Sequence, residues 1–366
     1  MKKWVLYIVF LCPAFYASGQ KKEMKKSTPA PASKSVYKDE VEGSLEEAKG
    51  AAASSPGTAA DYVKQALQKS IETNDKNGEA KAYQTLGLIY YKQKVYLQAI
   101  ANYSKALQLF KNLKNETEAY NTENSLAEAY EANNNTNDAI RHYLALLNYP
   151  SVVNNDQVKS DIYVKCGDLS LKDQKLKEAN QYYLKALNIE EVRKNEKGIA
   201  SINNKLGTIY LNDEKPQQAL EYYSKSQSIA RKIDDKKELA ESYENIGNAY
   251  RKEKKLDKEL EVRKQSIEIN KSNNDREALT NDYLAVGENL VQQNKPEEAI
   301  PYLEKTVNIS NELGKLEKKK EAHLSLSEAY SKKGDYDKAI AEYKNYVSTI
   351  EALYKEKEAE LDKVMA

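Results

Sequence analysis

Apolar and small residues recur along this chain at spacings of three and four, the spacing of one face of an α-helix. One such stripe runs from Tyr83 through Leu86 and Gly87 to Tyr90, and a second occupies residues 99–106. The segment between the two stripes is short and polar, which is typical of a turn. The pattern therefore predicts two helices joined by a tight connection.

The same pattern returns every 40 residues, and the register does not slip over seven copies. The residue that opens each count is always small: Gly87, Ala127, Gly167, Gly207, Gly247, Gly287 and Ser327. The residue sixteen positions later is aromatic or apolar in all copies but one: Tyr103, Tyr143, Tyr183, Tyr223, Arg263, Leu303 and Tyr343. A fixed period of this length indicates tandem structural repeats. We interpret the small residues as the points where two antiparallel helices cross closely, with the tyrosine rings buried between them.

Composition agrees with a thin core shared between neighbouring helices. The chain has 366 residues, 28 Tyr but only 3 Phe, 31% charged side chains and a mean hydropathy of -0.81. A single large core would need more apolar residues, whereas a disordered chain would lack the regular stripes. The formal net charge of +1 gives no reason to expect nucleic acid as a partner.

The N-terminus has the features of a secretory signal peptide over residues 1–19. A basic start is followed by an apolar stretch at 4–13 and by the small residues 17–19. An uncleaved anchor is the alternative, but the apolar stretch is short for a membrane span. A lipoprotein signal is disfavoured, because it needs a small residue just before its cysteine and Leu11 precedes Cys12. We expect export, to the periplasm or envelope, and no membrane insertion of the mature chain.

Four further segments complete the expected organisation. Residues 20–42 are rich in Lys, Ser, Ala and Pro and are predicted to be a flexible linker. Residues 43–78 are a partial capping repeat, 79–350 hold the seven complete copies, and 351–366 extend the last helix. The C-terminal helix as a whole is also a candidate surface for homodimer formation.

The motif Leu-Gly-x-x-Tyr followed by Ala-x-x-x-Tyr-x-x-Ala resembles the tetratricopeptide repeat, over residues 58–350. The resemblance implies an all-α fold, a right-handed superhelical solenoid of antiparallel helix pairs that binds proteins or peptides. The usual period is about 34 residues, so the chain is similar to the longer variants of kinesin light chain. We expect the additional residues to lengthen the second helix and its loop, as at residues 107–115.

The fifth copy departs from the pattern, with Glu259 and Arg263 on its second helix. Two interpretations stay open from sequence. The helix is either poorly buried and forms a soft joint, or the two charges form a local pair four residues apart.

No catalytic, cofactor or metal motif is present, and an enzyme is not expected. His142 and His323 lie far apart in sequence, and His323 takes the place of Tyr83 in its repeat. Cys166 takes the place of Leu86, so we interpret it as a small buried apolar residue.

The resemblance places the binding groove on the concave face, lined by the first helix of each pair. Residues of those helices that face away from the core stripe are the candidate partner-binding residues. They are Asn121, Asn124, Glu128, Asp161, Lys165, Asp168, Asn204, Thr208, Asn245, Asn248, Arg251 and Glu288. The run 247–251 resembles the groove-lining stretch of long-repeat members that bind extended peptides. An ordinary solvated helix face is the alternative, and the carboxylate clamp of chaperone-binding members is not evident.

Residues 346–358 resemble the segment that closes the repeat array in envelope sensor proteins of the Bacteroidetes type, where a membrane span and a histidine kinase follow. The sequence therefore leaves two hypotheses for the function, both without catalysis. The first is a ligand-binding part of an envelope signalling system, and the second is a free-standing periplasmic scaffold or adaptor.

Overall fold

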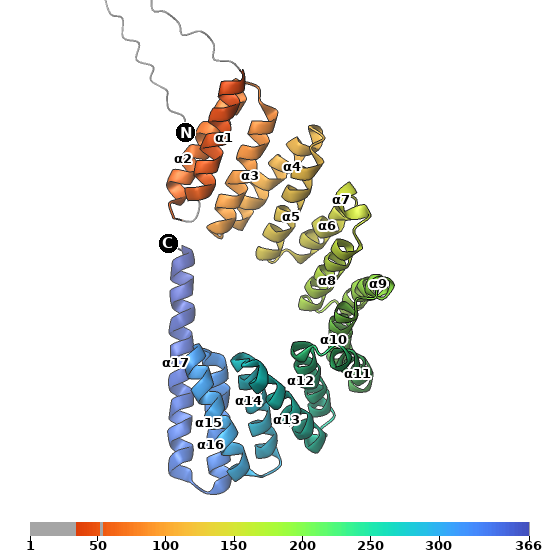
Figure 1. The fold of residues 1–366 in the computed structure, drawn as a ribbon. Helices are drawn as coiled ribbons and strands as arrows, with labels where there is room; N and C mark the ends of the chain where they lie inside the picture. The colour runs from red at the N-terminus through yellow and green to blue at the C-terminus, as the bar shows by residue number, and fades with distance from the viewer. Residues whose placement is uncertain (1–33, 52–53, 366) are drawn as a thin grey trace, which may run out of the picture.

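The computed structural model describes residues 34–51 and 54–365, and over these residues the chain forms seventeen α-helices and no strand. The helices pack in consecutive antiparallel pairs along an arc, with the two ends of the described chain facing each other across an opening (Figure 1). The fold is an all-α solenoid. The predicted signal peptide and the first part of the predicted linker lie outside the described residues.

Eight helices come first in their pairs. They are α1 (Lys34–Ala51), α3 (Lys76–Lys92), α5 (Glu116–Ala132), α8 (Asp156–Lys172), α10 (Glu196–Asn212), α12 (Lys236–Lys252), α14 (Arg276–Gln292) and α16 (Leu316–Lys333). Eight helices come second. They are α2 (Pro56–Glu72), α4 (Tyr96–Asn112), α6 (Thr136–Leu146), α9 (Leu176–Arg193), α11 (Pro216–Lys232), α13 (Leu256–Asn273), α15 (Pro296–Leu313) and α17 (Tyr336–Met365). One short helix, α7 (Pro150–Val153), lies between two pairs.

The turns between helices share one backbone geometry. After α3, Lys94 takes a left-handed conformation with φ of 62°. The amide of Lys94 then donates to the carbonyl of Tyr91, and the amide of Val95 donates to the carbonyl of Tyr90. This is the Schellman arrangement, which ends a helix and satisfies its last carbonyls. A left-handed residue recurs every 20 positions at nearly every turn, from Asn74 to Gly334.

Proline interrupts this regularity once. Because the residue before a proline is driven into an extended conformation, Tyr149 has φ of -78° and ψ of 139°. Helix α6 therefore ends at Leu146 with only 11 residues, and Pro150 starts the short α7.

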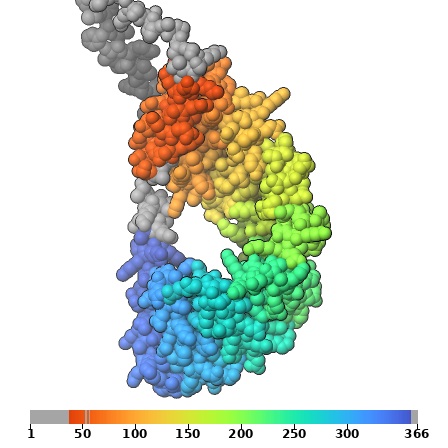
Figure 2. Space-filling model, in the orientation of Figure 1, coloured from red at the N-terminus to blue at the C-terminus, as the bar shows by residue number. Residues whose placement is uncertain are grey.

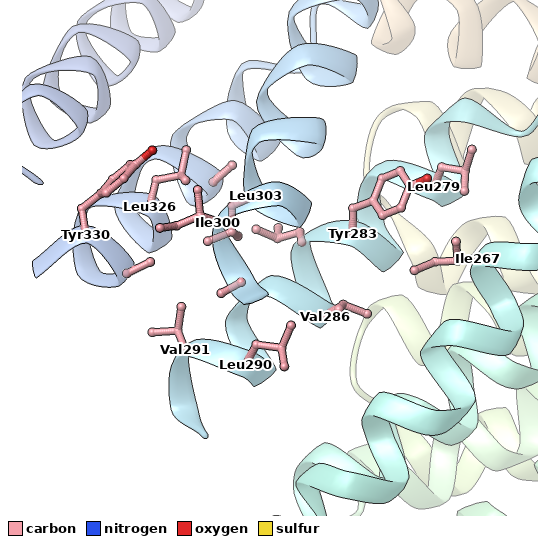
Figure 3. Packing of buried hydrophobic residues seen from close by; sticks show 14 of the residues in the cluster. Ile267, Leu279, Tyr283, Val286, Leu290, Val291, Ile300, Leu303, Leu326 and Tyr330 are labelled. Carbon is pink, nitrogen blue, oxygen red and sulfur yellow. The ribbon is translucent and has the colours of Figure 1, made fainter. Parts of the chain in front are cut away.

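The core is a series of small apolar clusters, each shared by neighbouring pairs. The cluster near the C-terminal end joins α13 to α17 and contains Leu290, Leu303 and Leu326 (Figure 3). Each cluster is formed by helices that are consecutive along the chain, as expected for a solenoid in which each repeat contacts only the repeats next to it.

Two features of the fold differ from the sequence prediction. Helix α1 begins at Lys34, so the linker expected to reach residue 42 ends earlier, and α1 with α2 forms a full helix pair. Val41 and Leu45 of α1 are buried in a cluster with apolar residues of α2 and α3, and this packing stabilises the helix. The extra residues of the long repeat are not concentrated in the second helix. Helices α3 and α4 have 17 residues each.

Candidate functional site

The first helices of the pairs line the inner side of the arc. Helices α8, α10 and α12 face the opening, whereas α9, α11 and α13 lie on the outer side (Figure 1). The space-filling view shows the central opening that these inner helices border (Figure 2). The inner surface contains two hollows, which we call the N-terminal hollow and the C-terminal hollow.

The N-terminal hollow has a volume of about 670 Å³ and lies mainly between α5 and α8. Asn124, Glu128, Asp161 and Lys165 were predicted to face the groove, and all four line it. The other lining residues are Tyr91, Tyr120, Glu131, Ala132, Tyr143, Leu146, Val158 and Ile162. The hollow thus combines tyrosine rings with polar and charged side chains.

Charge in the N-terminal hollow is predominantly negative. Lys165 Nζ lies 2.9 Å from Glu131 Oε1 and neutralises that carboxylate. The hydroxyl of Tyr143 donates to Glu131 Oε2 at 2.8 Å, and burial raises the pKa of this tyrosine well above its usual value. Glu128 and Asp161 remain exposed, each accepting a hydrogen bond only from a neutral amide, that of Asn124 or of Gln157.

The C-terminal hollow has a volume of about 600 Å³ and lies between α12, α14 and α16. The predicted residues Asn248, Arg251 and Glu288 line it. The other lining residues are Glu244, Arg263, Glu277, Asn281, Leu284, Ala285, Lys318 and Glu321. Burial raises the pKa of both Glu244 and Glu288, although Arg263 and Arg251 respectively oppose that shift.

Behind the C-terminal hollow lies a buried network of ion pairs. Arg263 is 2% exposed, and its Nη1 atom donates to Asp282 Oδ1 at 3.1 Å. Its Nη2 atom donates to Oδ1 of Asn248. Glu259 is 0% exposed and accepts from Arg251 Nε at 2.6 Å. Burial raises the pKa of Asp282, and the charge of Arg263 acts against that rise.

This network overturns both sequence interpretations of the fifth copy. Glu259 and Arg263 are fully buried, so α13 is not a poorly covered helix. They also do not pair with each other, since Glu259 bonds Arg251 and Asn289 while Arg263 bonds Asn248 and Asp282. Partners on α12 and α14 accommodate both charges, as buried charges require. The Nε atom of Arg263 is buried without a hydrogen-bond partner among the described residues.

Five of the predicted groove residues line neither hollow. Asn204 was expected to face the groove, but it is buried and its Nδ2 atom donates to Glu238 Oε1 at 2.7 Å. Thr208 accepts from the hydroxyl of Tyr223, and Asp168 accepts from the hydroxyl of Tyr183 at 2.6 Å. Thr208 is half-buried, and Asp168 keeps a 43% exposed side chain that also pairs with Lys205 Nζ at 2.7 Å. Asn121 is exposed and Asn245 is half-buried.

The repeat register could have identified several lining residues that were not predicted. Glu244 lies 120 residues after Asn124, and Glu321 lies 160 residues after Asp161. Glu131 lies 120 residues before Arg251. Each of these residues occupies the same repeat position as a predicted residue. Extending each predicted position to the other repeats in steps of 40 residues would have identified them.

The histidines and the cysteine occupy structural positions. His142 Nδ1 lies 2.6 Å from Glu123 Oε1, and His323 Nδ1 lies 2.6 Å from Glu342 Oε2. Burial works against ionisation of Glu123, but hydrogen bonds from His142 and Lys111 outweigh it and hold its pKa below the usual value. Cys166 is buried, and burial raises the pKa of its thiol to about 12.

The described part of the chain shows neither a membrane span nor a metal site. None of the helices within residues 34–51 and 54–365 is long and apolar enough to cross a membrane. Within the same described part of the chain, no three His, Cys, Asp or Glu side chains are grouped so as to hold a metal ion.

Comparison with known families agrees with this architecture. Residues 198–272 match one family model described as tetratricopeptide repeat, and residues 80–113 and 320–351 match another of the same description. The chain contains tetratricopeptide repeats. No curated protein sequence matches the chain.

Two solved structures show the same fold at low sequence identity. One is a signal-transduction ATPase with numerous domains and a tetratricopeptide repeat sensor, from Pyrococcus horikoshii. Its TM-score is 0.60 at 17% identity, with 89% of this chain and 50% of that chain covered. This chain therefore spans half the length of that protein. The second is aspartyl phosphate phosphatase F from Bacillus subtilis, with a TM-score of 0.54, 11% identity, and coverage of 88% and 96%.

Proposed function

We propose that the inner face of the solenoid binds an extended segment of a partner protein that carries basic side chains. The observation that supports this is the N-terminal hollow, where tyrosine rings and exposed carboxylates line one concave surface. A lysine or arginine side chain would meet negative charge at Glu128 and Asp161. Its cation could also stack on the rings of Tyr91 or Tyr120, an interaction that stabilises desolvated cations.

A second hollow further along the same face, lined by side chains of both charges, favours an extended ligand over a compact one. Four carboxylates line the C-terminal hollow, against three basic side chains. Amide side chains occur in both hollows, at Asn124 and at Asn281. An amide both donates and accepts, so it suits recognition of a peptide backbone.

Charge reversal tests this proposal. The double variant Glu128→Lys with Asp161→Lys reverses the N-terminal hollow. The matched control, Glu178→Lys with Glu221→Lys, makes the same charge change on exposed residues of the outer helices α9 and α11. The probes are two fluorescein-labelled nine-residue peptides, with Arg or with Glu at alternate positions, and fluorescence anisotropy reports binding.

We expect the Arg peptide to bind the unsubstituted chain and the outer-face control, and to lose at least ten-fold in affinity with the inner double variant. Equal binding of the Arg and Glu peptides, or equal binding by the two double variants, would refute the proposal. Circular dichroism of both variants checks that helix content is unchanged.

We further propose that this binding has a sensory role in the cell envelope. The signal-like residues 1–19 support export, and the analogy with a tetratricopeptide repeat sensor in the Pyrococcus horikoshii ATPase supports sensing. Immunoblotting of fractionated cells tests both points. We expect a species in the membrane fraction much larger than 41.5 kDa. The reason is that in the envelope sensor proteins that residues 346–358 resemble, a membrane span and a histidine kinase follow the repeats. A soluble periplasmic species near that mass would support a free-standing adaptor instead, and a cytoplasmic species would refute export.

A further inference from the structure

The second helices of the solenoid carry an apolar ridge, and only on α17 is that ridge uncovered among the described pairs. Helix α15 shows how the ridge is normally buried. Ile300 and Leu303 are 8% and 0% exposed, and they pack within the cluster that reaches α16. Forty residues later in the same register, Ile340 and Tyr343 are 55% and 52% exposed.

The difference arises because each ridge is covered by the first helix of the following pair. In the described residues α16 covers α15, whereas α17 has packed neighbours on one side only. In the ribbon view, no other described helix lies along the outer flank of α17 (Figure 1). Tyr336 and Val347 extend the exposed ridge at both ends. A ridge of four large apolar side chains is unusual on the surface of a protein that stays monomeric.

The spacing of the ridge suits a second helix of the same kind. Tyr336, Ile340, Tyr343 and Val347 follow one another at intervals of four, three and four residues. This is the alternation of core positions in a two-helix coiled coil, where each side chain packs between those of the facing helix. Such a seam can pair with a copy of itself, as a two-fold symmetric contact requires.

Charges beside the seam favour one orientation. Asp337 and Lys344 are exposed and occupy equivalent positions one heptad apart, immediately after Tyr336 and Tyr343. In an antiparallel pair, Tyr336 faces Val347 of the second copy and Ile340 faces Tyr343 of the second copy. Asp337 then lies beside Lys344 of the second copy, and the two-fold axis repeats that ion pair. A parallel pair brings no opposite charges together at these positions.

We propose that the chain forms a two-fold symmetric homodimer through an antiparallel pairing of α17 with α17 of a second copy. This inference is independent of the groove, because the ridge lies on the flank of the last helix. The dimer would leave the inner face of each copy free and would present two grooves to one partner, which raises the effective concentration of the second binding event.

Sedimentation equilibrium of the full chain over a range of concentrations measures this association. We expect a monomer–dimer equilibrium that the substitution Ile340→Lys weakens at least ten-fold. The matched control is Leu97→Lys, which changes a residue that is 70% exposed on α4, and it is expected to dimerise like the unsubstituted chain. A monomer at all concentrations, open-ended oligomers, or equal effects of the two lysine substitutions would overturn the proposal.

Charge exchange tests the orientation. Lys344→Asp alone places two acidic residues together and is expected to weaken the dimer, and more strongly at low salt. Adding Asp337→Lys to it restores opposite charges and is expected to restore the dimer. Failure of the second substitution to rescue the first would refute the antiparallel register.

Discussion

Gly207 lies so close to the ring of Tyr223 that a Cβ atom on this glycine would be 2.5 Å from the ring carbons Cδ1 and Cε1. Gly207 belongs to α10 and Tyr223 to α11, so the contact is the point where the two helices of a pair cross. Tyr223 is fully buried there. The ring takes the space that a side chain on α10 would occupy, which confirms the predicted role of the small residue in this repeat.

The substitution Gly207→Ala is therefore expected to destabilise the solenoid, although alanine favours helix in general. Overpacking at a crossing typically costs about 1–3 kcal/mol. Urea unfolding followed by circular dichroism measures the loss. Gly57→Ala is the control, because a Cβ atom at Gly57 meets nothing within 4 Å, and it is expected to leave the unfolding midpoint unchanged or to raise it. An equal effect at both sites would show that the ring of Tyr223 gives way.

Arg263 and Asp282 provide a second prediction. Replacing Arg263 by leucine, the residue at this repeat position in the next copy, removes the charge that partners buried Asp282. An unpaired buried charge typically costs about 3–5 kcal/mol. We expect urea unfolding of Arg263→Leu to show a large loss of stability.

The double variant Arg263→Leu with Asp282→Asn separates pairing from packing. Since it removes both charges, we expect it to recover a substantial part of the lost stability. If the double variant is less stable than Arg263→Leu alone, the buried pair is not what holds α13 to α14, and the remaining hydrogen bonds of the network carry that role.

The turns give a prediction of opposite sign. Lys94 holds φ of 62°, a conformation that costs most residues about 1–2 kcal/mol and glycine almost nothing. After the entropy that glycine loses on folding, Lys94→Gly is expected to stabilise the chain by about 0.5 kcal/mol. Lys92→Gly, at the last residue of α3, is the control and is expected to destabilise it. Differential scanning calorimetry compares the two, and a lower melting temperature for Lys94→Gly would contradict the argument.

The helix pairs were predictable because the same physical constraint recurs at each crossing. Seven copies in register show a small residue opposite a large one, and no single copy has to be read alone. The Schellman turns were less visible, since lysine, glutamate and aspartate occupy left-handed positions where glycine would have been the expected signal. The interrupted pair at α6 depends on a single residue, Pro150.

The buried polar side chains were not predictable from the repeat pattern. Asn204 has the register of a groove residue, yet it turns into the stack because Glu238 and Ser242 on α12 supply its hydrogen-bond partners. Glu259 and Arg263 looked like misplaced surface residues for the same reason. In each case the partner lies on another helix, and a pattern read along one helix does not contain it.

Glu238 makes the stability of the chain depend on pH. Burial raises the pKa of this carboxyl group to about 7, a nearby charge on Glu241 adds to the rise, and the hydrogen bond from Asn204 opposes it. In the unfolded chain the pKa is near the ordinary value of 4.5. The folded state therefore binds a proton more tightly than the unfolded state between these two values.

The sign of the effect follows from that difference. Below pH 4.5 both states are protonated at Glu238 and the residue exerts no penalty. As pH rises towards 7 the unfolded chain ionises first, so stability falls across this window and then stays lower. The upper limit of the loss is about 3.5 kcal/mol, because the pKa difference is about 2.5 units and each unit corresponds to about 1.4 kcal/mol.

Glu238→Gln tests this directly, since it keeps an oxygen for Asn204 and removes the titration. We expect the variant to unfold at a higher temperature than the unsubstituted chain at pH 8 and at a similar temperature at pH 4. Glu221→Gln, on the exposed face of α11, controls for the change in net charge and is expected to move neither value. A constant difference between Glu238→Gln and the unsubstituted chain at both pH values would mean that Glu238 keeps the same ionisation in the folded and unfolded states. The polar cluster around Asn204 would then accommodate a charged carboxylate.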